Sequence, residues 1–238
     1  MLGYDRAGGN TLDNFGRPLW GELLDVLRQR IVSGALTPGQ RLVEQDIASE
    51  FGISRGPVRS ALTELNRLGL VVVNPRRGTE VMAFGASDVQ ELYELREALE
   101  VLALRRAYNV KPQIIERLRR SMDRAAAARV DADFATSVDA DLEFHRELCH
   151  LSANRRLVAA WETQAEQIRA VISAAQRVGG ELVLPVLSEH NAIVEALSAG
   201  EPEQAQEALR RHLGDARDLL TQSSVAPFQE SSNGLTGG

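Results

Sequence analysis

The segment from residue 36 to residue 80 constrains the fold of this chain more than any other part of the sequence. It reads LTPGQRLVEQDIASEFGISRGPVRSALTELNRLGLVVVNPRRGTE, and its two short helical patterns, residues 44–51 and 55–68, meet at a tight glycine turn. Two strand patterns, residues 70–73 and 79–82, then flank a basic tip. Short helices joined by such a turn and followed by a two-stranded hairpin predict a winged helix-turn-helix, a unit that binds DNA.

The second of these helices has the composition of a helix that enters the major groove. Ser54 is placed to cap it, Arg55 and Arg59 lie one turn apart on the same face, and Gly56 removes bulk where a duplex could approach. A guanidinium can donate two parallel hydrogen bonds to guanine or bind a phosphate. An ordinary helical hairpin with a solvated basic face is the alternative. The ordered combination of helices, glycine turn and basic wing argues against it.

Further DNA contacts are expected outside this helix. Arg76 and Arg77 at the wing tip could reach phosphate or the minor groove, and Gly78 would permit a close approach. Arg41 and Gln45 are expected near the same surface, and Gln45 could touch phosphate. For these two side chains, plain solvent exposure is an equal alternative.

After Phe84 the sequence changes to almost continuous helical periodicity. Short connections and the absence of strand patterns predict an antiparallel six-helix bundle. We therefore expect a mainly α protein, with a winged helix-turn-helix and its two-stranded wing at residues 17–84, the bundle at 85–222, and mobile tails at 1–16 and 223–238. The bundle helices are expected at residues 87–108, 112–129, 131–150, 154–178, 184–199 and 202–220.

Charge and composition limit the possible functions. The formal net charge of −6 over 238 residues argues against binding of a polyanion by the whole surface. No segment approaches the ~18 apolar residues of a membrane span, and the N-terminus lacks the apolar core of a secretory signal, so we expect a cytoplasmic protein without a membrane partner. The one cysteine, Cys149, excludes an internal disulfide framework and a thiolate metal cluster.

Three histidines and an aspartate are expected to face the interior of the bundle. Asp141 and His145 lie one turn apart on an apolar stripe, and His190 and His212 lie on the apolar faces of two later helices. Buried imidazole and carboxylate groups are costly without a partner, and this set suits Zn²⁺ or Ni²⁺, or Mn²⁺ at higher coordination. Periodicity alone leaves open that these are separate, hydrogen-bonded core histidines. His150 is off the stripe and is interpreted as a non-ligand.

The N-terminal motifs closely resemble those of the GntR superfamily of bacterial transcription regulators. The resemblance is carried by LTPGQRL, EQDIA, FGISRGPVRSAL and LGLVVV, and it covers residues 17–84. The usual helix motif is SRxPVREAL, and Ser60 replaces its acidic residue here, a departure that affects local helix pairing. The resemblance implies that the operator is contacted by Ser54, Arg55, Arg59 and the wing around Arg77 and Gly78.

The C-terminal motifs are similar to those of the ligand-binding FCD domain found in the FadR branch of that superfamily. They are DLEFH at residues 141–145, SEH at 188–190 and RRH at 210–212, and a count of six helices resembles the VanR-type subgroup. The resemblance implies that one divalent ion, with zinc the first expectation, is held by Asp141, His145, His190 and His212.

Arg96 lies within an apolar stripe, where a charge is expensive. Pairing with Glu100, four residues later, is one explanation. The segment LYELREALE at residues 92–100 is typical of the opening of the FCD domain, and that resemblance implies instead that Arg96 faces an effector cavity. A guanidinium there would favour a carboxylate ligand.

These features together predict a homodimeric, metal-containing transcriptional regulator. In this family such proteins are more often repressors, and we expect binding to a palindromic operator in double-stranded DNA, controlled by a small organic acid. A regulator that senses the metal ion itself would use the same ligands. A metal-dependent hydrolase would also need a general base, and the sequence contains no HExxH motif, so we do not expect an enzyme.

Overall fold

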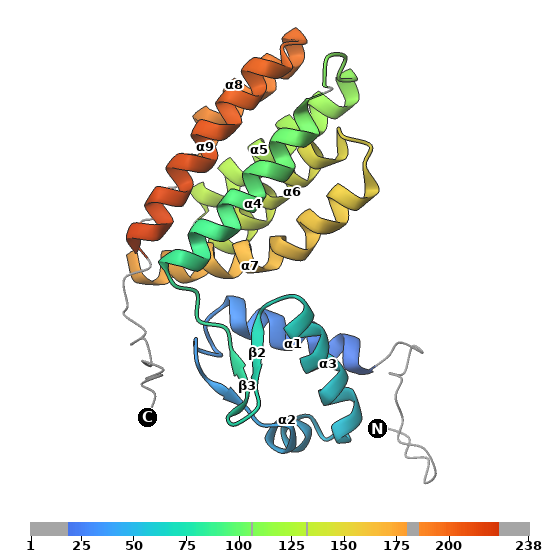
Figure 1. The fold of residues 1–238 in the computed structure, drawn as a ribbon, viewed down its shortest axis with the longest axis vertical. Coiled ribbons are helices and arrows are strands. Elements are labelled where there is room, and N and C mark those ends of the chain that lie inside the picture. Colours follow the sequence, from blue (N-terminus) through green and yellow to red (C-terminus); the bar gives the residue numbers. More distant parts are fainter. Residues whose placement is uncertain (1–18, 106, 132, 180–185, 224–238) are drawn as a thin grey trace, which may run out of the picture.

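The computed structural model describes residues 19–105, 107–131, 133–179 and 186–223. Figure 1 shows a bundle built from α4 to α9 and, below it, a smaller part built from α1 to α3 and a short sheet. Within these ranges no helix is long and apolar enough to cross a membrane. The helices are α1 (Leu19–Val32), α2 (Glu44–Phe51), α3 (Arg55–Arg67), α4 (Ala86–Leu104), α5 (Pro112–Val130), α6 (Phe134–His150), α7 (Arg155–Gly179), α8 (Val186–Ala199) and α9 (Pro202–Ser223).

The predicted two-stranded wing is present, and a third strand joins it. Strands β2 (Val71–Asn74) and β3 (Gly78–Val81) pair antiparallel, with Val71 opposite Val81, and β1 (Arg41–Leu42) pairs with the other edge of β3. The sheet order is therefore β1-β3-β2. The sequence did not predict β1, because a strand of two residues is too short to show an alternating pattern.

The helix-turn-helix forms as its sequence predicts. Gly52 ends α2 in the left-handed conformation, at φ +64°, where a side chain would be strained. Ser54 takes the N-cap position of α3, although its side chain makes no capping hydrogen bond. On the inner face of α3, Val58 and Leu65 are fully buried and belong to the same apolar core as α1 and the sheet.

The bundle helices form near the predicted positions, with two corrections at their N-termini. α4 begins one residue before the predicted start at Ser87. The cap is Gly85, whose N–H donates to Asp88 Oδ2 at 2.7 Å, and the helix begins at Ala86. α6 begins at Phe134 and not at residue 131, because Asp133 accepts a hydrogen bond from the Thr136 backbone at 3.1 Å and so caps the helix there.

Phe134, the first residue of α6, is 46% exposed, whereas Val138 and Leu148, further along the helix on the same face as Asp141 and His145, are buried. The tails were predicted at residues 1–16 and 223–238; Ser223 belongs to α9 instead, and the remaining tail residues lie outside the described residues.

The bundle and the N-terminal part meet along α7. Ala170 of α7 belongs to the N-terminal apolar core, and Glu166 accepts a hydrogen bond from Arg28 of α1 at 3.2 Å. The side chain of Gln167 covers Gly69, at the turn that ends α3. Figure 1 shows α7 crossing beneath the bundle, next to α1. A single helix therefore contacts both apolar cores.

Candidate metal centre and nucleic-acid interface

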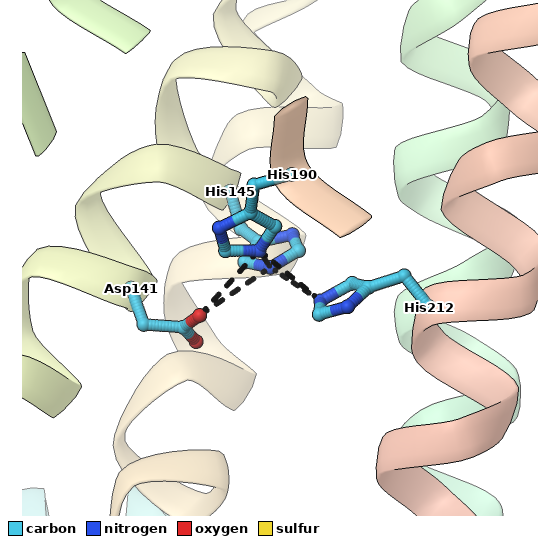
Figure 2. A group of neighbouring side chains, drawn as sticks. All are labelled: Asp141, His145, His190 and His212. Carbon is cyan, nitrogen blue, oxygen red and sulfur yellow. Dashed lines mark hydrogen bonds and ion pairs between the residues drawn. The ribbon is translucent and has the colours of Figure 1, made fainter. Parts of the chain in front are cut away.

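The four predicted metal ligands converge inside the bundle. Figure 2 shows Asp141 and His145 from α6, with His190 from α8 and His212 from α9 pointing at the same place. The Nε2 atom of His190 lies 3.2 Å from each of the other two Nε2 atoms, which are 3.3 Å apart. Asp141 Oδ1 lies 3.6 Å from His190 Nε2 and 3.9 Å from His145 Nε2.

Two carboxylates set the tautomers of this cluster. His145 Nδ1 lies 2.6 Å from Glu100 Oε2, and His212 Nδ1 lies 2.8 Å from Glu189 Oε2. Burial lowers the pKa of all three imidazoles well below the usual value, which favours their neutral forms. A neutral imidazole that donates its Nδ1 proton to a carboxylate presents a lone pair at Nε2.

The ionisation of Glu100 is subject to opposing influences. Burial raises the pKa of this carboxyl group, whereas the charge of Arg96 lowers it. Arg96 Nε and Trp161 Nε1 both donate to Oε1, at 2.9 and 2.8 Å. Two donors converge on one oxygen and one of them is a guanidinium, so we treat Glu100 as a carboxylate.

These contacts give the cluster the donor set of a cation site. The lone pairs of His145 and His212 face each other at 3.3 Å, which is unfavourable unless an electrophile lies between them. Asp141 Oδ1 is buried and has no hydrogen-bond partner among the described residues. Tetrahedral coordination with metal–nitrogen bonds of about 2.05 Å would separate the nitrogens by about 3.3 Å. The four residues therefore fit a divalent ion.

Arg96 pairs with Glu100, as one of its two predicted explanations requires. It is 1% exposed, its Nε donates to Glu100, and its Nη1 donates to the hydroxyl of Tyr93 at 3.3 Å. Its Nη2 lies 3.9 Å from Asp141 Oδ2 and has no hydrogen-bond partner among the described residues. Burial raises the pKa of Asp141 to about 6, although the charge of Arg96 opposes that shift. A guanidinium donor therefore lies unused beside the cluster.

Sequence reasoning missed Glu189 and Trp161, which hydrogen bond within this centre, and the buried Gln164 on the helix of Trp161. Glu189 precedes His190 in the chain, a proximity that could have suggested its role, whereas Trp161 resembles an ordinary core residue. Gln164 is only 5% exposed, and both polar atoms of its amide lack partners in the described structure. It lies one turn after Trp161, on the same buried face of α7. His150, interpreted as a non-ligand, is exposed.

The predicted DNA-binding residues lie at the end of the molecule that is farthest from the bundle. In Figure 1 the start of α3, helix α2 and the turn between β2 and β3 are all at the lower end. Arg55 and Arg59 are exposed on α3, with 59% and 66% of their side chains accessible. The wing residues Arg76 and Arg77 and the α2 residue Gln45 are also exposed.

Glu44, the first residue of α2, pairs with Arg55 and Arg59 of α3. Its carboxylate accepts hydrogen bonds from Arg55 Nη2 at 3.1 Å and from Arg59 Nη2 at 3.0 Å, and these bonds lower its pKa. The sequence did not single out this residue. Glu44 is 11 positions before Arg55 and lies in the preceding helix, so no local pattern indicated the pairing.

Two glycines of the predicted interface differ in what the fold requires of them. Gly78 has a φ of +83°, so the wing turn itself favours glycine. At Gly56 an added Cβ would meet only Ser54 Oγ, at 3.9 Å. Packing within the chain therefore does not require glycine at that position, which leaves close approach of another molecule as an explanation.

Both parts of the chain match known protein families. Residues 21–81 match the gntR family of bacterial regulatory proteins, and residues 91–215 match the FCD domain. A protein of Paenarthrobacter nicotinovorans named "Probable D-xylose utilization operon transcriptional repressor" is 31% identical over 193 residues, which cover 81% of this chain and 84% of that protein. The HTH-type transcriptional repressor RspR of Escherichia coli is 26% identical over 210 residues, covering 87% and 90%.

A solved structure shares the whole architecture. The crystal structure of a GntR transcriptional regulator from Rhodococcus sp. RHA1 superposes with a TM-score of 0.72 at 27% identity, over 85% of this chain and 97% of that one. The arrangement of a small N-terminal part and a helical bundle is thus found in an experimental structure.

Proposed function

The chain belongs to the GntR family of bacterial transcription regulators and carries an FCD domain, and from this premise we propose a repressor whose operator binding is controlled by a small organic acid. Residues 17–84 would bind the operator, and residues 85–222 would bind the acid and form a homodimer. The observation that carries this proposal is the convergence of three buried imidazoles and a buried aspartate on one point, with a guanidinium nitrogen that lacks a hydrogen-bond partner among the described residues beside the aspartate.

On the DNA side, the proposal rests on exposed arginines in a defined arrangement. Arg55 and Arg59 lie on the outer face of α3 and would contact base edges in the major groove. Ser54 and Gly56 would lie where the DNA comes closest to the backbone of α3. Phosphates would be contacted from the wing and from α2. The residues proposed for these contacts are Gln45, Arg76, Arg77 and Gly78.

On the ligand side, we propose that a divalent metal ion, zinc in the first place, is held by Asp141, His145, His190 and His212. The separations of 3.2 to 3.3 Å between the Nε2 atoms match the ~3.3 Å of a tetrahedral zinc site better than the ~3.0 Å of an octahedral one. Nickel and manganese are the other candidates. When bound, such an ion would offer Lewis acidity toward a carboxylate or hydroxyl oxygen.

Arg96 would supply the second contact to the acid. Its Nη2 is the guanidinium donor that its neighbours Glu100 and Tyr93 leave free, and it lies beside Asp141. Buried polar groups without partners are rare and are explained when a ligand completes them. A carboxylate that accepted from Arg96 would satisfy this group by a charge-assisted hydrogen bond.

We propose that α7 transmits the state of this site to the DNA-binding part. Trp161 of α7 donates to Glu100 at the cluster, and Glu166 and Gln167 of the same helix contact α1 and the turn at Gly69. A ligand changes operator binding only if the protein has two arrangements of these elements and the ligand binds one of them more tightly. A displacement of α7 would change the position of α1 relative to the bundle.

A regulator that senses the metal ion itself is the second candidate. It is favoured by the number of ligands, since four protein ligands can complete the coordination of a tetrahedral ion and leave no place for an acid. An organic acid would then require expansion to five-coordination or a metal that prefers higher coordination numbers.

The experiment is an electrophoretic mobility shift with the upstream region of the gene and with metal-free and metal-loaded protein. Arg55→Ala combined with Arg59→Ala should weaken binding by roughly 10²-fold or more, because each lost arginine contact contributes about 1–3 kcal/mol. Arg67→Ala is the matched control, since this exposed arginine lies at the far end of α3 and pairs with Glu64. Undiminished binding by the double variant would defeat the DNA assignment.

The same assay separates the two modes of control. Release of the DNA by an organic acid, seen only with metal-loaded protein, supports the proposed effector. Release by the metal alone supports the metal sensor. An acid that acts equally on metal-free protein would contradict capture at the metal centre.

A further inference from the structure

An exposed stripe runs along the outer face of α4. Its members are Glu91, Leu95, Ala98, Leu102 and Arg105, which follow one another at steps of four, three, four and three residues. These steps keep all five side chains on one face of a helix, in the spacing of a helix–helix seam. The two leucines are large apolar residues, 51% and 46% exposed.

The opposite face of the same helix is fully occupied. It carries Tyr93, Arg96 and Glu100, all buried, and packs against α6, α7 and α9. The five side chains of the outer stripe are exposed and so are not packed between α4 and these helices. Single exposed leucines are common on protein surfaces and need no explanation. The informative feature here is the order in which apolar, small and charged residues follow one another.

That order is self-complementary when the helix is paired with a copy running in the opposite direction. The acidic residue Glu91 is seven residues before Ala98, and the basic residue Arg105 is seven residues after it. Leu95 and Leu102 lie three residues before and four residues after the same alanine. A two-fold axis near Ala98 therefore places Leu95 of one copy beside Leu102 of the other. At about 1.5 Å of rise per residue, their positions along the helix axis differ by about 1.5 Å.

We propose that this α4 stripe is the centre of a two-fold interface with a second copy of the chain. In that pairing, Glu91 of each copy faces Arg105 of the other, the leucines pack together, and Ala98 lets the two backbones approach. An interface formed by the same patch on both copies is what a two-fold dimer requires. The inference rests on the homodimer of the proposed function and assigns its contact surface.

The position of the stripe has a consequence for control. Arg96 and Glu100 of the candidate metal centre lie on the inner face of α4, and the proposed dimer contact lies on its outer face. A shift of α4 caused by a ligand at Arg96 would therefore move the dimer contact directly. The separation of the two DNA-binding parts in the dimer depends on that contact.

The first experiment is a charge reversal with rescue, measured by light scattering over a range of protein concentrations. Glu91→Arg and Arg105→Glu should each raise the dimer dissociation constant by roughly tenfold, since each substitution acts twice in a two-fold interface. The double variant should restore the wild-type value. Glu116→Arg on the exposed face of α5 is the matched control and should leave association unchanged.

The second experiment uses Ala98→Cys in the full-length protein with the mild oxidant diamide. Two copies of residue 98 close to the axis should form an intermolecular disulfide, whereas wild type should not, because Cys149 is fully buried. Circular dichroism would confirm that every variant is folded. The crosslink reports the proximity of the two copies of residue 98 and not the effect of a charge, so it is an independent readout.

The outcomes distinguish the inference from the function on which it rests. Wild type that stays monomeric at all concentrations overturns both the homodimer and this interface. Wild type that is dimeric, with unchanged association of both single variants and no crosslink through residue 98, overturns the interface alone. Loss in each single variant, recovery in the double variant and crosslinking through residue 98 support it.

Discussion

Replacement of Glu100 by glutamine should damage the metal centre although Glu100 is not one of its ligands. Glu100 Oε1 accepts from Arg96 and Trp161, and its Oε2 pairs with His145 Nδ1. Glutamine has nearly the same shape, but one of its two polar atoms is a donor. The amide can therefore be placed in two ways, and both are unfavourable.

In the first placement the amide N–H₂ faces His145. Nδ1 of that ring must then accept, so its proton moves to Nε2 and the lone pair needed for a metal is lost. In the second placement the N–H₂ faces the N–H groups of Arg96 and Trp161, so hydrogen-bond donors face one another and no acceptor is present. This removes two hydrogen bonds, one of them charged and worth about 1.5–3 kcal/mol. Arg96 also loses its nearest buried counter-charge, so we expect a total loss of about 3–5 kcal/mol in the free energy of unfolding.

The assay has two parts, a competition titration of zinc with a chromogenic chelator and urea unfolding of the metal-free protein. Glu100→Gln should weaken metal binding by roughly 10- to 100-fold, as expected when a ligand loses its orienting partner. Glu203→Gln is the control, because this exposed carboxylate only accepts from the Tyr108 hydroxyl. A folded Glu100→Gln variant with the metal affinity of wild type would refute the argument on tautomers.

Three further predictions concern other positions. Gln164→Leu should stabilise the metal-free protein by about 1–3 kcal/mol in urea unfolding, because it removes a buried amide that has no partners in the described structure. If that amide binds the ligand, the variant should also be stabilised less by organic acids. Destabilisation would show that the amide has a partner. Gly69→Ala should lower the free energy of unfolding by about 1–2 kcal/mol in the same assay, since φ is +70° and the new Cβ would lie 2.5 Å from Gln167 Nε2. Adding Gln167→Ala should remove the close contact but not the backbone strain. An unaltered stability of Gly69→Ala would contradict the predicted strain. Glu44→Gln should raise binding to random-sequence DNA and steepen its salt dependence by about one unit, because the negative charge that pairs with Arg55 and Arg59 is removed. An unchanged slope would argue against this.

The sequence predicted the parts of this protein that follow from local patterns. The helix-turn-helix and the bundle helices could be located because their apolar periodicity and turn residues act over a few neighbouring positions. The convergence of Asp141, His145, His190 and His212 was predicted from their places on apolar faces together with a family resemblance. Periodicity alone left open that they were separate, hydrogen-bonded core residues.

The remaining features depend on contacts between residues that are distant in sequence. Glu100 contacts His145 across 45 positions and Trp161 across 61, and no local pattern contains such a pairing. The same holds for Arg28 and Glu166, which join the two apolar cores across 138 positions. β1 and the caps at Gly85 and Asp133 were missed or misplaced for a different reason, since one or two residues decide each of them.

The charges around the metal centre constrain the kind of acid that fits it. Among the buried groups, Arg96 contributes one positive charge, and Glu100 and Asp141 contribute one negative charge each, so these groups with neutral imidazoles have a net charge of −1. Glu189, which pairs with His212, does not enter this count because its side chain is 18% exposed and is hydrated. A divalent ion changes this to +1, and a monocarboxylate would make the buried site neutral, whereas a second buried carboxylate would leave it at −1. Buried net charge is costly, so a monocarboxylate should stabilise the metal-loaded protein more than a dicarboxylate of the same length in a thermal-shift assay. A stronger shift with the dicarboxylate would mean that its second carboxylate reaches solvent or meets another cation, and the count of buried charges would then be wrong.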